Sequence, residues 1–301
     1  MNPLACRLCP RSCGVSRETP KTLGTCKSGG QMHIARAALH HWEEPPISGK
    51  KGSGAVFFTG CPLGCLYCQN YEISTAENPG REVSPEELSG IFFQLIEAGA
   101  HNINLVTPTH FVPQIRRALL IKKPPVPVIY NTSGYERVET LQSLEGLVDV
   151  YLPDYKYAQE KLSKDLSAAL DYSQRAVEAI EEMLRQTGLP QYDGEGMMVK
   201  GVMIRHLILP GHTKNSLQVL EAIGRRFPGV PVSLMAQYTP WGKAKEPGGI
   251  PGYPELSRAI TRRELHKVQD ALFSLGLDGF VQSREAKGAK YIPDFGTEKE
   301  K

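Results

Sequence analysis

One short segment decides the fold, and it reads Gly60-Cys61-Pro62-Leu63-Gly64-Cys65-Leu66-Tyr67-Cys68-Gln69-Asn70. Its three cysteines have the spacing C-x3-C-x2-C and follow directly on the apolar residues 55–58, which are typical of a buried strand. Three thiolates on one loop can hold three corners of a cubane iron–sulfur cluster, which leaves one iron without a protein ligand. An open coordination position is what catalysis at a metal requires. A zinc knuckle that takes a ligand from elsewhere in the chain is the alternative interpretation.

Strands and helices alternate from this loop onward. Ser84, Pro85 and Glu87 predict the start of a helix, because Ser caps, Pro suits the first position and Glu closes a capping box. Thr261 and Glu264 predict the start of the last helix in the same way. Apolar runs predict strands at residues 55–58, 102–106, 126–130, 148–152, 202–209, 232–235 and around 280–281. Helices are expected at 84–99, 113–120, 136–144, within 163–187 and at about 215–226.

This alternation of about six β-then-α units indicates an α/β fold with a parallel sheet and right-handed crossovers. The strands are too few for a complete eight-stranded barrel. We therefore expect a partial (β/α)6 barrel, with an open doubly wound sheet as the alternative. In both folds the chemistry belongs at the carboxyl ends of the strands.

The chain divides into three predicted regions. Residues 1–50 form a cysteine-rich extension in which only 32–42 are a candidate for a short regular element. Residues 51–285 hold the alternating strands and helices, and residues 286–301 form a charged tail.

Composition narrows the class of protein. Apolar residues make up 41% and charged residues 22% of the 301 residues, which excludes global disorder. The net charge of +3 is too small to argue for a nucleic-acid or membrane partner. All seven cysteines lie in the first 68 residues, which is a poor disulfide framework. Neither an apolar leader before Cys6 nor a run near the ~20 apolar residues of a membrane span is present, so we expect a soluble, cytoplasmic protein in a reducing compartment.

Four cysteines precede the loop, in the spacing Cys6-x2-Cys9-x3-Cys13-x12-Cys26. Four thiolates can close a tetrahedral zinc site or complete an iron–sulfur cluster, and the spacing does not separate the two. The segment is too short and too poor in apolar residues to fold alone, so a bound metal would stabilise it. We expect the nearby histidines to be surface or core residues: His33, His40 and His41.

The loop with Cys61, Cys65, Tyr67 and Cys68 after a first strand resembles the radical S-adenosylmethionine (SAM) superfamily. Residues 67–70 and later segments resemble its pyruvate formate-lyase activating enzyme-like branch, in particular members with an amino-terminal cysteine-rich segment. The resemblance extends to about residue 282. It implies a [4Fe–4S] cluster whose open iron binds the amino and carboxylate groups of SAM. Reductive cleavage of SAM then yields methionine and a 5′-deoxyadenosyl radical, which abstracts hydrogen from a substrate.

The same resemblance implies partners. An electron donor such as flavodoxin or ferredoxin would reduce the cluster, and the substrate would be a protein glycine, as in glycyl-radical activation. Modification of a small molecule or another peptide is the alternative within the superfamily. A non-enzymatic zinc-binding protein is the alternative outside it.

Two strand ends resemble motifs of the activating enzymes. Residues 131–134, Asn-Thr-Ser-Gly, resemble their Asp-Thr-Asn-Gly, which makes Asn131 and Ser133 candidates for cofactor binding. Residues 154–156, Asp-Tyr-Lys, resemble their Asp-Leu-Lys. Lys156 is the candidate to pair with the SAM carboxylate as a compact point charge, and Asp154 could position it or bind a monovalent cation.

The remaining candidates carry less specific signals. Much of the superfamily has Gly-Gly-Glu at the end of the second strand to hold the methionine amine, and this chain has no such Glu there. The candidates at this strand end are Asn104, Thr107 and His110. His110 is either a ligand or a loop histidine with satisfied hydrogen bonds. Arg205 lies in an apolar strand similar to an Arg-Tyr-x-x-x-Pro-Gly segment, so it needs either a cofactor or a buried ion pair. The neighbouring His206 is expected to pack on the opposite side. Tyr238 either stacks on the adenine or packs in the core.

Overall fold

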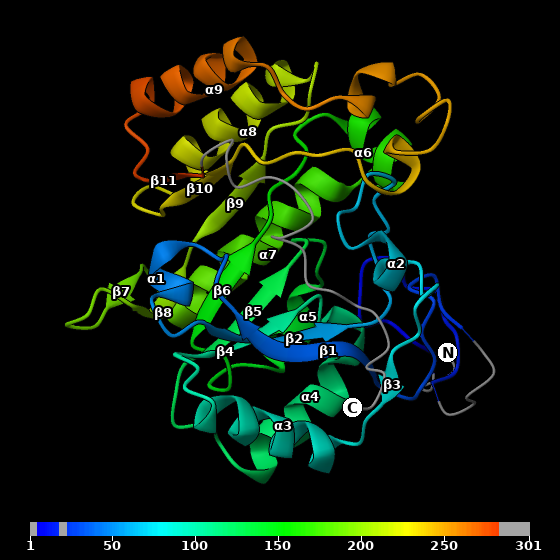
Figure 1. Ribbon diagram of the computed structural model, residues 1–301, viewed down its shortest axis with the longest axis vertical. Helices are drawn as coiled ribbons and strands as arrows, with labels where there is room; N and C mark the ends of the chain where they lie inside the picture. Colours follow the sequence, from blue (N-terminus) through cyan, green and yellow to red (C-terminus); the bar gives the residue numbers. More distant parts are fainter. Residues whose placement is uncertain (1–4, 18–22, 283–301) are drawn as a thin grey trace.

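The computed structural model describes residues 5–17 and 23–282. The predicted charged tail, 286–301, lies outside the described residues. Figure 1 shows the strands as one curved layer with helices packed around it.

Parallel strands form the centre of the molecule. Two sets of neighbouring parallel strands are present, and the first set consists of β2 (Ser53–Phe58), β4 (Ile103–Val106), β5 (Val128–Thr132) and β6 (Val150–Pro153). The second set consists of β9 (Ile204–Leu207), β10 (Val232–Met235) and β11 (Gly279–Gln282). A parallel bridge between Asp154 and Arg205 joins the two sets. The predicted α/β fold with a partial barrel of parallel strands is therefore confirmed.

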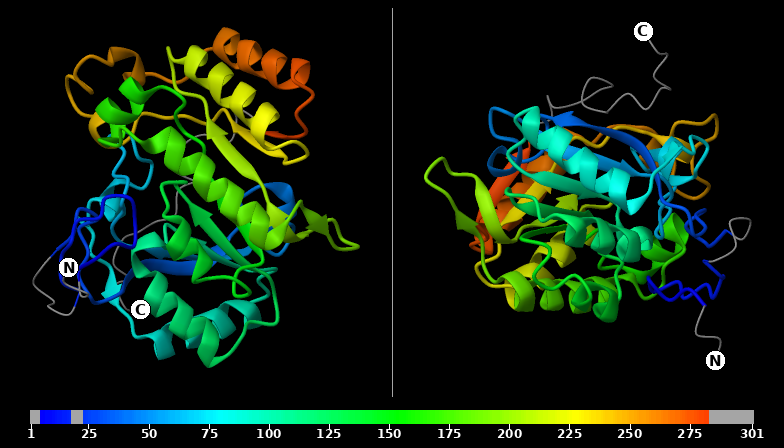
Figure 2. Two further views of the ribbon diagram at one scale, coloured as in Figure 1. Left: turned by 180° about the vertical axis from the view of Figure 1, so that it is seen from behind. Right: turned by 90° about the horizontal axis from the view of Figure 1, so that it is seen from below.

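Helices connect the parallel strands along the chain. Their bounds are α3 (Pro85–Glu97), α4 (Val112–Ile121), α5 (Val138–Gln142), α6 (Glu160–Ser167), α7 (Tyr172–Thr187), α8 (Thr213–Arg226) and α9 (Arg262–Ser274). Seen from behind in Figure 2, α7 lies across the outer side of the strands. Parallel neighbours with a helical crossover between them leave their carboxyl ends along one edge.

Two helix starts follow the predicted capping chemistry. Ser84 accepts a hydrogen bond from Glu87 N, and Thr261 accepts one from Glu264 N, each as part of a complete capping box. The helical region predicted within 163–187 is two helices rather than one. Ala168 adopts a left-handed conformation with φ 49°, which ends α6 before α7 begins.

An antiparallel edge precedes the parallel strands in the sequence. β1 (His33–His40) pairs along its length with β2 and, at its start, with β3 (Arg81–Glu82). The short helix α1 (Pro45–Ser48) follows β1, and α2 (Tyr71–Ser74) follows the cysteine loop. Residues 33–40 of the predicted extension are thus built into the main sheet, while the domain boundary near residue 50 stays a prediction.

The predicted strand 202–209 is divided in two. β8 (Met198–Val202) pairs with β6 and, in a hairpin, with β7 (Gln191–Tyr192), whereas β9 pairs with β10. The core between strands and helices holds five fully buried tyrosines: Tyr130, Tyr151, Tyr155, Tyr157 and Tyr172. None of the helices within residues 5–17 and 23–282 combines the length and the apolar character needed to cross a membrane.

Candidate active site

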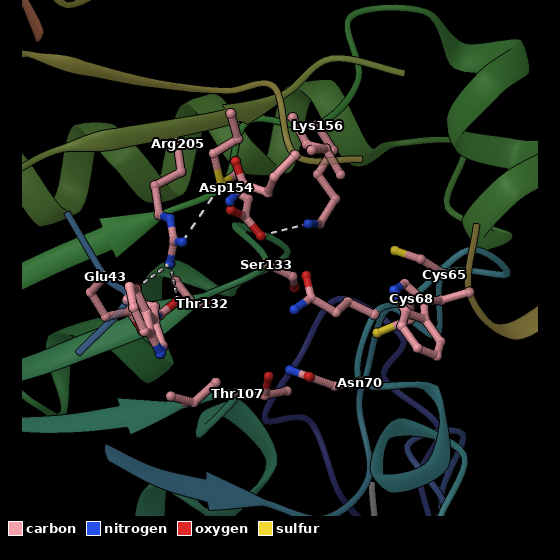
Figure 3. A pocket seen from close by; sticks show the side chains of 18 of the residues that line it. Glu43, Cys65, Cys68, Asn70, Thr107, Thr132, Ser133, Asp154, Lys156 and Arg205 are labelled. Atoms are coloured by element: carbon pink, nitrogen blue, oxygen red, sulfur yellow. Dashed lines mark hydrogen bonds and ion pairs between the residues drawn. The ribbon is translucent and has the colours of Figure 1, made fainter. Parts of the chain in front are cut away.

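A cavity of about 410 Å³ lies at the carboxyl ends of the parallel strands. Its wall takes Thr107 from the end of β4, Ser133 from the end of β5, Asp154 from the end of β6 and Gln237 from the end of β10. The three cysteines of the loop after β2 complete one end of the wall, and Figure 3 shows Cys65 and Cys68 there, facing the side on which Lys156 lies. The parallel sheet therefore brings the loop cysteines and the strand-end residues into one site.

Buried thiols define the cysteine end of the cavity. Burial and the neighbouring Cys65 and Cys68 thiols raise the pKa of Cys61 to about 12. Burial and Cys65 likewise raise the pKa of Cys68 to about 11. Thiols that lie this close and this dry resist ionisation on their own, whereas coordination to a metal centre deprotonates them outright. This donor set of three gathered sulfurs fits a thiolate-ligated cluster with one corner left open.

The first glycine of the loop has no room for a side chain. Gly60 has φ +87°, and a Cβ there would lie 2.4 Å from both Cys26 O and Ser28 Oγ. Gly64 has φ +63° with nothing within 4 Å of an added Cβ. Gly60 is thus required for close packing of the cysteine loop on the amino-terminal segment as well as for its turn.

The four amino-terminal cysteines are gathered beside the cysteine loop. Arg17 donates to Cys6 Sγ at 3.3 Å and to Cys26 Sγ at 3.4 Å. The Sγ atoms of Cys13 and Cys26 lie 3.1 and 3.5 Å from the Cβ position of Gly24. Burial, with the Cys26 and Cys6 thiols adding to it, raises the pKa of Cys9 to about 12.

The two sets of cysteines differ from a preformed single-ion site. Within residues 5–17 and 23–282, no three His, Cys, Asp or Glu side chains form a group that could hold one metal ion. A cubane cluster places its protein ligands on different irons, so its thiolates need not converge on a single point. Three loop cysteines that share one cavity wall are therefore compatible with a cluster, although they do not converge on one ion.

Asp154 and Lys156 form an ion pair in the cavity wall, with Lys156 Nζ 2.5 Å from Asp154 Oδ2 (Figure 3). Burial opposes the charged form of Lys156, but Asp154 and the Cys65 and Cys68 thiols outweigh it and raise the pKa of the ammonium. The hydroxyl of Tyr172 lies 2.8 Å from Ser133 O and 2.9 Å from Asp154 O. One buried phenol therefore ties together the ends of two neighbouring strands.

Arg205 both lines the cavity and forms buried ion pairs. Its guanidinium lies 3.2 Å from Glu43 Oε2 and 3.1 Å from Glu44 Oε1. It also donates to Asn131 Oδ1 at 3.3 Å. Burial opposes the guanidinium charge, but Glu44, Glu43 and Asp154 outweigh it and raise the pKa of Arg205. Of the two roles that the sequence left open for this residue, the buried ion pair is present, and contact with a cofactor stays a prediction.

Two predicted cofactor-binding residues lie outside the cavity wall. Asn104 is fully buried and donates to Glu43 Oε1 at 3.1 Å. The His110 ring lies 2.8 Å from Thr59 O, and burial lowers the pKa of its imidazole to about 4. Neither residue is among those that line the cavity, so contact of either one with a cofactor stays a prediction.

The other candidates occupy the predicted positions. Thr107, Asn131, Ser133 and Tyr238 all line the cavity, and Tyr238 also donates to Leu256 O at 2.7 Å. His206 packs away from the cavity, with ring nitrogens 2.7 Å from Tyr155 O and 2.9 Å from Ser216 Oγ. Its role as a packed histidine agrees with the expectation from its alternation with Arg205.

Sequence reasoning missed one wall of the cavity. His40, His41, Trp42, Glu43 and Pro45 line it from the amino-terminal segment after β1. The signal that could have found them is the acidic pair at 43 and 44 before two prolines, because a buried arginine in a strand needs acidic partners.

Gln237 adds an unused acceptor to the same cavity. Its Oε1 atom is buried and has no hydrogen-bond partner among the described residues. A buried polar atom without a partner calls for a ligand or water. The cavity wall therefore combines the ion pair of Asp154 and Lys156 with a glutamine whose carbonyl oxygen lacks a partner among the described residues.

Comparisons with known proteins agree with this site. The family model described as the radical SAM superfamily matches residues 55–223, more than half of the chain. An uncharacterized protein of Methanocaldococcus jannaschii is 29% identical over 282 residues, covering 91% of this chain and 75% of the relative.

One of the solved structures described here shares the fold. SuiB of Streptococcus suis, in its S-adenosylmethionine-bound crystal structure, matches with a TM-score of 0.50 and 13% identity over 74% of this chain and 48% of that one. A domain of pyruvate-formate lyase-activating enzyme from Bacteroides vulgatus matches with a TM-score of 0.37 and 12% identity, over 66% of this chain and 91% of that domain.

Proposed function

The chain belongs to the radical SAM superfamily, and on that premise we propose that it uses a [4Fe–4S] cluster on Cys61, Cys65 and Cys68 to abstract hydrogen from a substrate. One observation carries the proposal: the three loop cysteines and the strand-end residues Asp154 and Lys156 line the same cavity. A closed structural metal site would not need to open onto a cavity of about 410 Å³.

The protein's own residues position the cofactor. When bound, the cluster and SAM supply one-electron cleavage of the sulfonium and, with it, hydrogen-atom abstraction. Lys156 offers an ammonium held by Asp154 at 2.5 Å, which suits the SAM carboxylate. Gln237 lines the same cavity, and its side chain would accept from the ammonium of SAM through Oε1, which has no hydrogen-bond partner among the described residues, once that atom turns toward the ligand.

The wall opposite the cysteines keeps the cavity rigid. Arg205 is held between Glu43 and Glu44, so its charge is neutralised before any ligand binds. Thr107, Asn131, Ser133 and Tyr238 complete the proposed cofactor surface. Fixed, desolvated dipoles of this kind favour a defined ligand orientation and exclude water.

The proposed substrate is a protein glycine, as in activating enzymes. The support is the resemblance of the strand ends at 131–134 and 154–156 to motifs of that branch. Flavodoxin or ferredoxin is the proposed electron donor. A small molecule or another peptide is a second candidate substrate. Its support is the extra cavity wall from the amino-terminal segment, which consists of His40, His41, Trp42, Glu43 and Pro45.

The amino-terminal tetrad is proposed to hold zinc or a second [4Fe–4S] cluster. Its support is the gathering of Cys6, Cys13 and Cys26 around Arg17 and Gly24. Metal and sulfide analysis of anaerobically purified protein distinguishes the two, with Cys26→Ala as the matched variant. Loss of zinc alone in that variant identifies zinc, whereas loss of iron and sulfide together identifies a cluster.

Reductive cleavage of SAM is the direct test of the enzyme function. Protein reconstituted anaerobically with iron and sulfide, then given dithionite and SAM, should release 5′-deoxyadenosine. Cys65→Ala should lose both the cluster and the product. Absence of 5′-deoxyadenosine from a wild-type protein that holds a full cluster would contradict the proposal. Incubation with a candidate glycyl-radical enzyme, followed by paramagnetic resonance of the protein radical, tests the substrate class separately.

A further inference from the structure

A row of buried hydroxyl groups ends on the sulfur of Cys65. Ser167 Oγ donates to Cys65 Sγ at 3.1 Å. The Tyr157 hydroxyl lies 2.8 Å from Ser167 Oγ, and the Tyr67 hydroxyl lies 2.7 Å from that of Tyr157. Tyr157 OH also lies 3.9 Å from the same sulfur. Two hydroxyls from the segment 157–167 thus reach the sulfur of Cys65, and the Tyr67 hydroxyl of the loop itself extends the row.

The direction of these hydrogen bonds follows from their chemistry. A thiolate only accepts, whereas each hydroxyl has one proton to donate and can accept as well. With Ser167 donating to the sulfur, Tyr157 can donate to Ser167, and Tyr67 can donate to Tyr157. All three side chains are buried, so water does not compete for these protons. Consecutive hydrogen bonds in a dry environment polarise one another and strengthen the last bond in the row.

We propose that the Ser167 hydroxyl, supported by Tyr157 and Tyr67, raises the reduction potential of the cluster held by the cysteine loop. This inference rests on the proposed function, because it requires a cluster bound through Cys65. One-electron reduction adds negative charge to the cluster and its thiolates. A donor aimed at a ligating sulfur stabilises that added charge, and hydrogen bonds to sulfur are among the factors that set cluster potentials.

The backbone around Ser167 is fixed to the cysteine loop. Leu66 N donates to Leu166 O at 2.9 Å. Arg11 donates to Ser167 O at 2.6 Å and to Leu63 O at 3.1 Å. The donor and the sulfur are therefore held together by contacts that do not involve the Ser167 hydroxyl. Removing the hydroxyl should leave the loop in place, which makes the side chain testable by substitution.

The matched set of variants is Ser167→Ala, Ser167→Thr and the control Ser163→Ala. Ser163 lies on the same helix α6 and is also buried, but its hydroxyl donates to Glu160 O at 3.0 Å. The readout is the midpoint potential of the reconstituted cluster, titrated with dithionite as the source of one electron and followed by paramagnetic resonance without SAM. Ser167→Ala should shift the reduction equilibrium toward the oxidised cluster by about tenfold, or about 59 mV for a one-electron couple.

The other variants make the result specific. Ser167→Thr keeps the hydroxyl and should retain the wild-type potential, and Ser163→Ala should match the wild type. Tyr157→Phe leaves Ser167 in place and should lower the potential by less than Ser167→Ala, since it removes the support and the longer contact of 3.9 Å with the sulfur but keeps the donor at 3.1 Å. If Ser167→Ala fails to assemble a cluster, a wild-type potential in Tyr157→Phe overturns the inference.

The test separates this inference from the proposed function. A wild-type protein that binds no cluster or does not cleave SAM overturns the proposed function, whatever the potentials of the variants. A cluster that forms and cleaves SAM while Ser167→Ala keeps the wild-type potential overturns only the role of the hydroxyl.

Discussion

Replacing Arg205 by Met should destabilise the folded protein, because the substitution removes the guanidinium that two buried carboxylates share. The side chains of Arg205, Glu43 and Glu44 are 13%, 7% and 0% exposed. Breaking a buried ion pair by removing one partner costs about 3–5 kcal/mol, because the remaining charge stays desolvated. Asn131 would also lose the donor that lies 3.3 Å from its Oδ1. We therefore expect the free energy of unfolding of Arg205→Met to fall by about 3–5 kcal/mol.

Urea unfolding at neutral pH, followed by circular dichroism, measures this change. The control is Arg226→Met, whose guanidinium lies 3.2 Å from Glu181 in a pair about half exposed on both sides. An exposed pair of this kind contributes about 0–1 kcal/mol. The triple variant Glu43→Gln, Glu44→Gln and Arg205→Met removes the uncompensated charges and should recover part of the loss. A fall of less than about 1 kcal/mol in Arg205→Met would refute the assignment of a buried ionic cluster.

Three further predictions test the loop, the cofactor contact and the core. Gly60→Ala should lower the iron content after reconstitution, because the added Cβ would meet neighbouring atoms at 2.4 Å. Gly64→Ala is the control, because nothing lies within 4 Å of its added Cβ. Equal iron contents in the two variants would contradict this prediction. Lys156→Met should weaken SAM binding by about tenfold or more in calorimetry, whereas Lys161→Met, at an exposed position, should leave it unchanged. Equal affinities of the two variants would show that Lys156 does not bind the SAM carboxylate. Burial lowers the pKa of His206 to about 4, below the 6.5 of the unfolded chain, so its contribution to stability is present above pH 6.5 and is lost as the pH falls toward 4. His206→Asn should flatten the pH dependence of urea unfolding in that interval by about 3 kcal/mol, and an unchanged slope would show that other groups cause it.

Local signals predicted the helices and parallel strands well. The capping boxes at Ser84 and Thr261 involve residues three apart, so both partners stand in one short stretch of sequence. The apolar runs that became β2, β4, β5, β6 and β10 are buried on both faces, as parallel strands between other layers are. Because the carboxyl ends of parallel strands meet at one edge, the order of the strands alone predicts that Ser133, Asp154 and Lys156 lie together there, and all three line the cavity.

Pairings across the chain were beyond local reasoning. β1 is an antiparallel neighbour of β2, and nothing in its own residues identifies that partner. The cavity wall after β1 was missed for the same reason, because the ion pair of Glu43 with Arg205 joins residues that are far apart in the sequence. Asn104 and His110 show the limit of judging a residue by its place near a strand end. Both stand where a cofactor ligand would, yet neither lines the cavity: Asn104 donates to Glu43, and the His110 ring contacts Thr59 O.

The contacts of Arg11 are ones that a sequence pattern does not predict. It lies between two cysteines of the amino-terminal tetrad and donates to Pro62 O and Leu63 O in the cysteine loop, at 2.9 and 3.1 Å. It also donates to the backbone oxygens of Ser167 and Ala168 at the end of α6. Backbone oxygens have no side-chain signature, so nothing in the sequence of this segment indicates these contacts. One guanidinium thus joins the amino-terminal segment to the cysteine loop and to the helix that carries Ser167, so this segment packs directly against the candidate active site.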